Sequence, residues 1–332
     1  MGKTDLIGLL NPVPGMVFQD TRSTLLGADR PIVCDKDRVH YGVDYLDKAL
    51  GGIRNSELVM ITAESGAGKT QFVTNIALTN ARQGKRVHFI ALEAYRGEIQ
   101  DRIEFNKLAE KYYAFENRPY MQQGLSLRFS DFVDGKYNKL FSHLHEGTED
   151  GMGLENLFTY YRNDEFTIDS MKLVVTGIKD RTDLVIIDHV HYFDYDEEQA
   201  NKALKFIAKE ARDLALIHNI PIILVAHIRK QDLKNRPLAP HREDIHGSGD
   251  LSKIATTVIT LGRGDIVERG RYITYFRIAK SRIDGGLDRY AAMVVFDSRK
   301  LEYSGDFKIG LLTGYGQKFE LLAGDMIPNW AK

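Results

Sequence analysis

Uninterrupted runs of apolar residues recur along the chain and predict buried strands. The clearest of them lie at residues 58–63, 87–92, 184–187 and 221–226. Runs without polar alternation are typical of parallel strands that helices cover on both faces. Apolar residues at helical spacing follow, most clearly over residues 71–83 and 197–219. This alternation of strands and helices predicts an α/β fold with a mainly parallel, twisted sheet flanked by helices.

Strict alternation of apolar and polar residues near the C-terminus predicts antiparallel strands instead. Residues 258–261 and 272–282 are the first of these strands. A Gly-rich turn at 284–286 leads back through residues 289–297, and a further hairpin is expected around residues 314–317. The parallel sheet should therefore continue into C-terminal antiparallel hairpins.

The pattern is weakest over residues 115–180. Helices are expected there over residues 130–145 and 166–177, with a strand at 157–162. Aromatic side chains are dense in this stretch, and we interpret them as core residues rather than as a platform on which nucleic-acid bases stack. They are Phe129, Phe132, Phe141, Phe158, Tyr160 and Tyr161.

Composition describes an ordinary globular protein. The chain has 332 residues, of which 43% are hydrophobic and 27% are charged, enough for a full core in one large or two modest domains. Residues 1–40 hold three of the eight prolines and little periodicity. We interpret them as an extended arm, and composition leaves open whether it is a mobile tail or a strap on a neighbouring subunit.

Charge and cysteine usage limit the partners and the compartment. The formal net charge is −1, so a nucleic-acid surface must be a local basic patch. A single cysteine, Cys34, excludes an intrachain disulfide and favours a reducing compartment. The sequence contains no apolar run of 18 residues and its first residues do not have the layout of a signal peptide, so no membrane association and a cytoplasmic location are expected.

The segment AESGAGKT, from Ala63 to Thr70, predicts a phosphate-binding P-loop between a strand and a helix. Glycines at 66 and 68 let the backbone curl so that N–H groups point at phosphate oxygens. Lys69 should reach the β- and γ-phosphates, and the Thr70 hydroxyl should bind Mg²⁺. Ala63 departs from the pattern, which usually begins with Gly. The predicted nucleotide-binding residues are Ser65, Gly66, Ala67, Gly68, Lys69, Thr70 and Gln71.

Two carboxylates end apolar runs where a ligand of an open α/β sheet would lie. Asp188 is the predicted second metal residue, opposite Thr70. Glu93 ends a run expected beside the P-loop strand. Position alone leaves it either a base that activates water or an acid at a helix N-terminus. His189 and His191 lack a third ligand at suitable spacing, so we interpret them as polar residues of a crevice loop.

His227 ends the run 221–226 and could hydrogen-bond the γ-phosphate, although an isolated histidine is more often a buried residue bonded to backbone. Because four predicted strands end in polar residues on one sheet edge, we favour the phosphate-sensing role. The segment that follows is a polar loop, which either tracks a phosphate backbone or is simply solvated. The candidate DNA-binding residues are Arg229, Lys230, Lys234, Arg236, Arg242, His246 and Gly249.

Lys280 and Arg282 lie two residues apart in a predicted strand, so both should project the same way. Two such cations are either surface charge or a phosphate clamp. An arginine supplied by a neighbouring subunit is a known device of P-loop enzymes.

Taken together, these elements resemble the RecA-like motor domain of DnaB-family replicative helicases. The segments that carry the resemblance are 42–70, 89–103, 184–193, 220–230, 236–261 and 277–285. In order, they resemble the family's P-loop entry, the strand and helix with its catalytic glutamate, its Walker B strand, its γ-phosphate sensor strand, its DNA-channel loop and its KxR element. The resemblance implies a motor domain at 41–297, with 1–40 as an arm and 298–332 as a hairpin extension.

The resemblance also implies a function. The chain is expected to form a hexameric ring that hydrolyses ATP with Mg²⁺ and translocates on single-stranded DNA in replication. Glu93, Lys69 and His227 would act on ATP from one subunit, and Lys280 and Arg282 from the next. Primase, a polymerase or a loader are the expected partners.

Departures from the family keep other functions open. Nothing resembles the family's N-terminal collar, which suggests a phage or plasmid protein, and His246-Gly247 stands where many members have Arg-Glu. One alternative is a RecA- or KaiC-type ATPase, whether recombinase, loader or regulatory ring, that hydrolyses ATP without unwinding. Another is a nucleotide-gated scaffold that binds a partner through its N-terminal arm.

Overall fold

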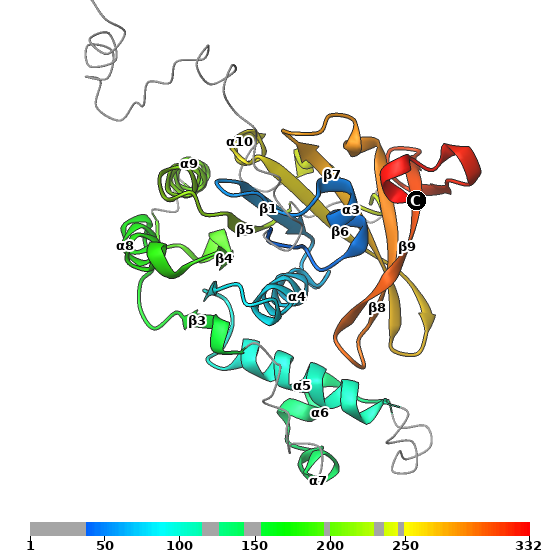
Figure 1. Cartoon of the computed structure of the whole chain (residues 1–332), viewed down its shortest axis with the longest axis horizontal. Helices are drawn as coiled ribbons and strands as arrows, with labels where there is room; N and C mark the ends of the chain where they lie inside the picture. Colours follow the sequence, from blue (N-terminus) through cyan, green and yellow to red (C-terminus); the bar gives the residue numbers. More distant parts are fainter. Residues whose placement is uncertain (1–37, 115–125, 143–153, 196–199, 229–235, 245–248) are drawn as a thin grey trace, which may run out of the picture. The chain divides into compact units, whose positions relative to one another are not determined.

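The computed structural model describes residues 38–114, 126–142, 154–195, 200–228, 236–244 and 249–332 (Figure 1). Its α-helices are α3 (Asp44–Leu50), α4 (Lys69–Arg82), α5 (Glu98–Tyr112), α6 (Phe129–Val133), α7 (Asn138–Phe141), α8 (Ile168–Ile178), α9 (Ala200–His218) and α10 (Gly249–Ile254). Short 3₁₀ turns connect several of them. None of the helices in these ranges is long and apolar enough to cross a membrane.

Within the described ranges, ten strands form a single sheet in the order β10-β9-β8-β7-β6-β1-β5-β4-β2-β3. Their bounds are β1 (Leu58–Ala63), β2 (Val87–Ala91), β3 (Leu157–Tyr161), β4 (Leu184–Asp188), β5 (Ile222–His227), β6 (Thr257–Glu268), β7 (Arg271–Ser281), β8 (Tyr290–Asp297), β9 (Glu302–Thr313) and β10 (Lys318–Leu321). The strands from β6 to β3 pair in parallel, and those from β6 to β10 pair antiparallel. The predicted mainly parallel sheet with C-terminal antiparallel hairpins is confirmed.

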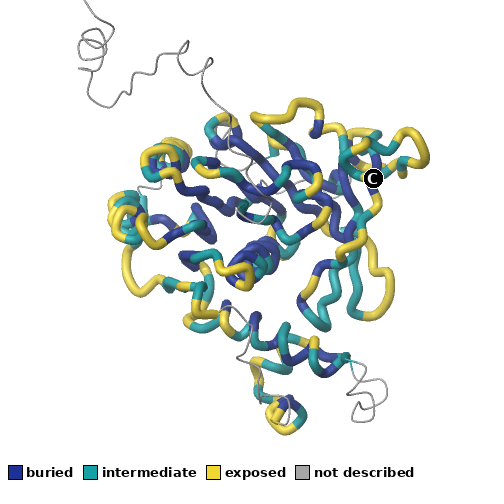
Figure 2. The backbone as a smooth tube through the Cα atoms, in the orientation of Figure 1, coloured by how far each residue is buried: buried dark blue, intermediate teal, exposed yellow. Residues whose placement is uncertain are grey.

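The parallel strands owe their continuous apolar sequences to burial on both faces. In β1, Val59 and Ile61 face one core cluster with helix α4, whereas Leu58 and Met60 face another with helices α8 and α9. Figure 1 shows α4 and α9 on opposite sides of β1, β5 and β4. In Figure 2 these central strands are buried, and exposed residues lie on the outer faces of the helices.

The sheet order corrects one expectation. The strand that leads to Glu93 was expected beside the P-loop strand, but β5 and β4 lie between β1 and β2. The carboxyl ends of these parallel strands still meet at one edge of the sheet, as predicted. The correction follows from tertiary packing, because an apolar run indicates burial but not which neighbour it pairs with.

The C-terminal strands extend the sheet without a break. β9 pairs with β8, and β10 pairs with β9 through the predicted turn around residues 314–317. Residues 302–321 therefore belong to the same sheet as the P-loop strand. The boundary drawn at residue 297 stays a prediction.

The middle of the chain differs from its predicted helices. In place of one helix over 130–145 there are two short ones, α6 and α7, on either side of Gly135, whose φ of +72° is left-handed. Residues 143–145 lie outside the described residues. The next predicted helix is confirmed as α8, which starts at Ile168 because Thr167 and Ser170 form a capping box.

The aromatic side chains of this region pack mainly against one another and α5. Phe141 is buried in a small cluster with Phe105, and Phe129 and Phe132 are packed against it. Phe158 is an exception, since it is 42% exposed and stacks on His88. Their interpretation as core residues fits this cluster and not Phe158.

Candidate functional site

The P-loop connects β1 to α4 as the sequence predicts. Gly66 and Gly68 adopt φ angles of +77° and +96°, which residues with a side chain rarely adopt, so the tight curl depends on glycine. Lys69 begins α4 directly after the turn. Ala63, in place of the usual glycine, is the last residue of β1 and is fully buried in the core, where its methyl group fits.

Lys69 is folded back onto its own loop. Its Nζ donates to the carbonyl oxygens of Ala63 at 3.1 Å and Glu64 at 3.0 Å. Burial lowers the pKa of Lys69, and the carboxylates of Asp188 and Glu93 oppose that shift. A phosphate group would offer this buried ammonium a stronger, charged partner than two carbonyls do.

Asp188 is buried next to Thr70. Burial raises the pKa of Asp188 to about 6, while a hydrogen bond with Thr70 lowers it. Among the described residues, nothing hydrogen-bonds its Oδ1. A buried carboxylate oxygen without a partner beside a hydroxyl is a donor set that suits Mg²⁺, so these two residues fit the predicted metal site.

Glu93 reaches the same place from β2. Its main-chain N–H donates to Asp188 O at 3.4 Å, and the N–H of Leu92 donates to the same oxygen at 2.7 Å. The first turn of α5 carries Glu98 and Asp101, so Glu93 is not the acid at that helix N-terminus. Glu93 lines the P-loop pocket instead, and its role as a base that activates water stays a prediction.

Two ring systems surround the Glu93 carboxylate. The Tyr192 hydroxyl donates to Glu93 Oε1 at 3.5 Å. His189 Nε2 lies 2.9 Å from Glu93 Oε2, but the two are not aligned for a hydrogen bond, and His189 Nε2 has no such partner among the described residues. Burial, followed by the rings of His227 and His191, lowers the pKa of His189 to about 2, so His189 is neutral near pH 7.

His227 is the last residue of β5 and is half-buried. Its ring centroid lies 4.1 Å from that of His189, at nearly a right angle. It pairs in register with Ala63 of the P-loop strand. His227, the predicted γ-phosphate sensor, therefore lies beside the start of the P-loop.

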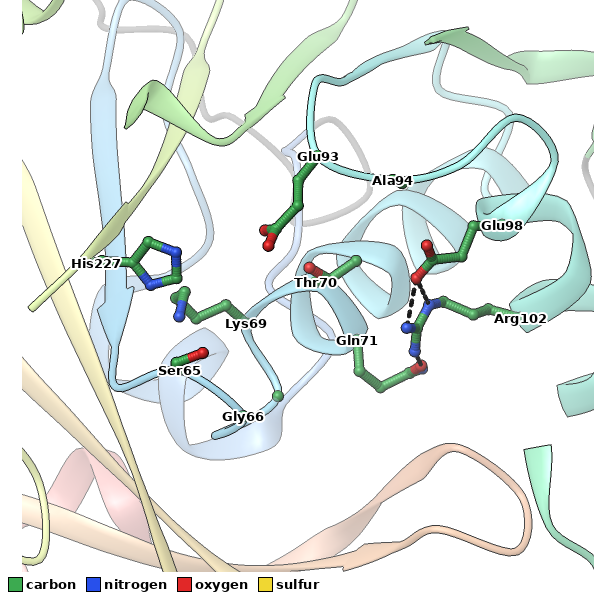
Figure 3. A pocket seen from close by; sticks show the side chains of 11 residues that line it. Ser65, Gly66, Lys69, Thr70, Gln71, Glu93, Ala94, Glu98, Arg102 and His227 are labelled. Carbon is green, nitrogen blue, oxygen red and sulfur yellow. Dashed lines mark hydrogen bonds and ion pairs between the residues drawn. The ribbon is translucent and has the colours of Figure 1, made fainter. Parts of the chain in front are cut away.

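These groups line a pocket of about 360 Å³ (Figure 3). Its lining residues are Ser65, Gly66, Gly68, Lys69, Thr70, Gln71, Glu93, Ala94, Glu98, Arg102 and His227. Of the predicted nucleotide-binding residues, Ala67 is absent from this lining. Lys69, Glu93 and His227 come from three different segments and point into the same space.

Sequence reasoning missed Glu98 and Arg102, which line this pocket. The Arg102 guanidinium donates to Glu98 Oε1 at 2.6 Å and to Gln71 Oε1 at 3.2 Å. The signal was present, because a glutamate and an arginine four residues apart share one helix face. The spacing alone could not assign these two residues to the pocket, because it does not show that this face of α5 turns toward the P-loop.

A pocket of about 260 Å³ lies on the other side of the P-loop. Its lining residues are Gly66, Ala67, Gly68, Arg263, Tyr272, Thr274, Phe296, Ser298 and Tyr303. The Arg263 guanidinium stacks 4.7 Å over the Tyr272 ring. Apart from the three P-loop residues, the lining residues come from β6, β7, β8 and β9 or, for Ser298, directly follow β8, so no local sequence pattern could have united them with the P-loop.

The candidate DNA-binding residues are only partly described. Arg229, Lys230, Lys234 and His246 lie outside the described residues. Arg236 forms an ion pair with Glu64 of the P-loop, and Arg242 pairs with Glu243 at 2.7 Å. Gly249 is the first residue of α10. Arg236 therefore already has an acidic partner in the chain, which competes with any DNA phosphate.

The described part of this loop is fixed against the sheet. The Thr260 hydroxyl donates to Pro240 O at 2.7 Å. Gly262 of β6 allows the main chain of the loop to pass close to the strand, because a Cβ there would lie 1.5 Å from Leu238 O. The loop after His227 is thus tied to β6 at residues 238–240.

Lys280 and Arg282 lie at the opposite edge of the sheet from the P-loop. Lys280 pairs with Val258 near the start of β6, and Arg282 N–H donates to Thr256 O at 2.9 Å. Neither Lys280 nor Arg282 lines a P-loop pocket of its own chain.

The two cations differ in their contacts. Lys280 Nζ donates to the carbonyl oxygens of Ser252, Lys253 and Ala255 at the end of α10. Arg282, which follows the end of β7, is exposed. The neighbouring charges of Arg242 and Arg282 act on Lys280, and Arg212 is acted on by Arg282 as well as by the carboxylates of Glu57 and Asp213.

Comparison with known families identifies this architecture. Residues 39–300 match the family model of the DnaB-like helicase C terminal domain. The chain belongs to this family. The match covers the P-loop, the strand ends that carry Glu93, Asp188 and His227, and the segment with Lys280 and Arg282.

Curated DnaB-like relatives are distant in sequence. A DNA helicase/primase of Enterobacteria phage T3 is 25% identical over 249 residues, covering 72% of this chain and 40% of the relative. A replicative DNA helicase DnaB of Treponema pallidum is 26% identical, covering 73% and 50%. A probable plasmid replicative DNA helicase of Chlamydia psittaci is 24% identical, covering 69% and 49%. The chain thus spans half or less of the length of these relatives.

Two solved structures share the fold. One is an ATPase domain, which superposes with a TM-score of 0.64 at 15% identity, covering 86% of this chain and 95% of that one. The other is a DnaB-like replicative helicase, described with its interactions with primase, which gives 0.55 at 16% identity, covering 91% and 66%.

Proposed function

We propose that this chain is the motor of a ring-shaped helicase that hydrolyses ATP and translocates on single-stranded DNA during replication. The observation that carries the proposal is the pocket in which the P-loop, Glu93 and His227 converge, with Asp188 buried beside Thr70. Membership of the DnaB-like family supports it.

ATP would bind across the P-loop. Lys69 would exchange the carbonyls of Ala63 and Glu64 for the β- and γ-phosphates, and the loop N–H groups would hold phosphate oxygens. The base would enter the pocket beside Ala67, where Tyr272 offers an aromatic face. Thr70 and Asp188 would hold Mg²⁺, which neutralises phosphate charge when it is bound.

Glu93 would orient or deprotonate the attacking water. Its side chain lines the pocket and is partly exposed, with the Tyr192 hydroxyl near Oε1 and His189 Nε2 near Oε2, so water in the pocket could approach the carboxylate. A positioned base of this kind contributes about 10²–10⁴-fold to a rate. His227 would contact the γ-phosphate and pass its presence on to the loop that follows β5.

Lys280 and Arg282 would act on the ATP of a neighbouring subunit. They lie near the edge where the strands begin, outside the lining of their own pocket, and Arg282 is exposed. A head-to-tail ring brings this edge of one copy against the phosphates of the next. A hexamer is the proposed ring, with ATP at each interface.

DNA and protein partners follow from the same proposal. The basic residues after His227, from Arg229 to Gly249, would contact the phosphate backbone of DNA in the ring. Primase is a proposed partner because the similar DnaB-like helicase is described with it, and a polymerase or loader remains proposed on the sequence alone. Relatives from a phage and a plasmid support a role in replication of such a genome.

Strand displacement on forked DNA tests the proposal. The protein with ATP and Mg²⁺ should separate a labelled fork, and Lys69→Ala should separate none because the phosphates lose their charged partner. Hydrolysis of ATP that separates no fork under any ATP or salt condition would instead support the RecA- or KaiC-type alternative.

A further inference from the structure

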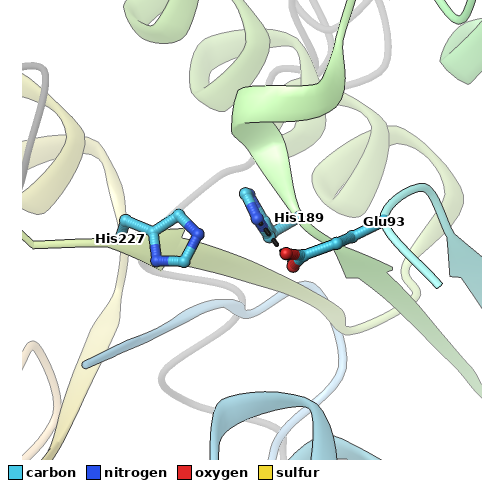
Figure 4. Close-up of side chains that lie close together, drawn as sticks. All are labelled: Glu93, His189 and His227. Carbon is cyan, nitrogen blue, oxygen red and sulfur yellow. Dashed lines mark ion pairs between the residues drawn. The ribbon is translucent and has the colours of Figure 1, made fainter. Parts of the chain in front are cut away.

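Three side chains from separate segments meet beside the P-loop. Glu93 follows β2, His189 follows β4 and His227 ends β5 (Figure 4). One ligand atom from each, a carboxylate oxygen and two imidazole nitrogens, can be chosen so that all lie within 4.8 Å of one another. The sequence hid this group because its members are 96 and 38 residues apart.

Two atoms of this group lie close together without a hydrogen bond between them. His189 Nε2 and Glu93 Oε2 are 2.9 Å apart, yet they are not aligned for hydrogen bonding. Two ligand atoms around one tetrahedral Zn²⁺ lie about 3.3 Å apart, given metal–ligand bonds of about 2.0–2.2 Å. They point at the metal ion rather than at each other. The observed pair needs only a small adjustment to meet that arrangement.

The three side chains differ in burial in a way that suits a binding site. His189 is 1% exposed and is held by packing, so one ligand is preorganised. Glu93 is 43% exposed on its side chain and His227 is half-buried, so these two can close the remaining distance. Tyr192 contacts Oε1 of Glu93 and leaves Oε2 directed at the histidines.

The donor set selects the kind of metal. Two imidazole nitrogens with one carboxylate oxygen suit Zn²⁺ and its neighbours in the first transition row, and three such ligands leave a fourth position for water. Mg²⁺ prefers oxygen ligands and would bind instead at Thr70 and Asp188. The two sites are thus chemically distinct although they are adjacent.

We propose that Glu93, His189 and His227 form a binding site for Zn²⁺ or a similar transition-metal ion, and that its occupation stops ATP hydrolysis. The ion would tie up the oxygen of Glu93 that faces water and the ring of His227 that faces the γ-phosphate. The inhibition rests on the proposed function, whereas the binding does not.

One contact opposes the site. The main-chain N–H of His191 donates to His189 Nδ1 at 3.3 Å. A metal on Nε2 leaves the ring proton on Nδ1, so this contact is given up. The contact is long for an N–H hydrogen bond, so the free energy lost with it is small compared with that of a metal–imidazole bond.

Co²⁺ binding tests the site without ATP. Metal-free full-length protein should develop the visible absorption bands of four-coordinate Co²⁺, and equimolar Zn²⁺ should remove them. His189→Gln should abolish the bands, and His227→Gln provides the same test if the first variant does not fold. His191→Gln, which alters the same turn outside the trio, should keep them. Absence of bands in the native protein, or equal bands in all variants, overturns the site.

Steady-state hydrolysis with excess Mg²⁺-ATP tests the consequence. Added Zn²⁺ should inhibit, and a zinc-selective chelator should restore the rate. Relative to each variant's own metal-free rate, half-inhibition should need at least about tenfold more Zn²⁺ in His189→Gln than in native protein or His191→Gln. Equal sensitivity of all three overturns the inhibition. A native protein that shows the Co²⁺ bands but never hydrolyses ATP contradicts the proposed function and leaves the metal site standing.

Discussion

The two edges of the parallel sheet differ in the side chains they carry, and in the proposed function each would supply a different part of one reaction. Where β1, β5, β4 and β2 end, a lysine, carboxylates and imidazoles surround a pocket that fits phosphates. Where the strands begin, Lys280 and Arg282 lie near Arg212 and Arg242, and no carboxylate is paired with Arg282 in the described part of the chain. One edge can bind and position ATP, whereas the other offers the positive charge that phosphoryl transfer needs.

Binding of ATP and supply of positive charge to its phosphates would therefore depend on two different edges of the sheet. The P-loop edge has Glu93 and the candidate metal residues, and its pocket lining includes two cations, Lys69 and Arg102. Arg102, the other cation of the pocket, is paired with Glu98. In the proposed ring, the far edge of a second copy would supply further positive charge to this site.

Loss of Arg282 should have the largest effect. Arg282→Ala should lower DNA-stimulated ATP hydrolysis by about 10³–10⁵-fold, because an arginine supplied by a neighbour stabilises the charge of the transition state. ATP binding should be nearly unchanged. Turnover assays with a fluorescent nucleotide for affinity measure both, and Arg269→Ala, an exposed arginine at the other end of β7, is the matched control. Equal activity of the two variants contradicts a catalytic role for this edge.

Loss of the Glu93 carboxylate should have the next largest effect. Glu93→Gln keeps the shape of the side chain but cannot take a proton, so hydrolysis should fall by about 10²–10⁴-fold with ATP affinity retained. Single-turnover hydrolysis and equilibrium binding separate the two quantities. A variant that loses affinity and rate in equal measure would assign Glu93 to binding instead.

The Asp188 carboxylate should lower the stability of the folded protein near pH 7 while it is needed to bind Mg²⁺. Its pKa in the folded protein is about 6, above that of an unfolded chain, so the folded protein takes up the proton first as the pH falls. The cost of burying the charge is present above pH 6 and is relieved between pH 6 and pH 4, and it amounts to at most about 3 kcal/mol.

Asp188→Asn should therefore raise the unfolding temperature of the nucleotide-free protein at pH 7.5 and have little effect at pH 4.5. It should also abolish Mg²⁺-dependent hydrolysis, because an amide is a poorer ligand for Mg²⁺ than a carboxylate. Thermal unfolding at the two pH values checks the first statement. Destabilisation at pH 7.5 would show that the attraction between Asp188 and Lys69 outweighs the cost of burying the carboxylate.

Lys280 should matter for stability as well as for turnover. Its ammonium holds the carbonyls of Ser252, Lys253 and Ala255, so Lys280→Met should lower the free energy of unfolding by about 1–3 kcal/mol. Lys318→Met, on an exposed position of β10, should have almost no effect. Denaturant unfolding measures both variants. An unchanged Lys280→Met would mean that this side chain is free to act on a neighbour's phosphates.

The sequence predicted the parts of the fold that depend on local patterning. Apolar runs located β1, β4 and β5, and the P-loop pattern located the turn before α4. Strand order could not be predicted, because burial of β2 on both faces is equally compatible with a place beside β1 or beside β4.

The candidate site also contains residues that could be predicted from the sequence and contacts that could not. Residues at strand ends, such as Glu93 and Asp188, were predictable because parallel strands end at a common edge. Groups formed across distant segments were not, and they include the contact of His189 with His227 and the pairing of Arg236 with Glu64. Nothing in the residues around Arg236 indicates that its partner is in the P-loop.

Mixed rings test the division between the two edges most directly. Arg282→Ala and Glu93→Gln subunits, each nearly inactive alone, should regain ATP hydrolysis when they are unfolded, mixed in equal amounts and reassembled. A site with Glu93 from one variant and Arg282 from the other is complete, so about one quarter of the native rate is expected for random head-to-tail assembly. A mixture with no more activity than its separate components would show that Arg282 does not act across the interface.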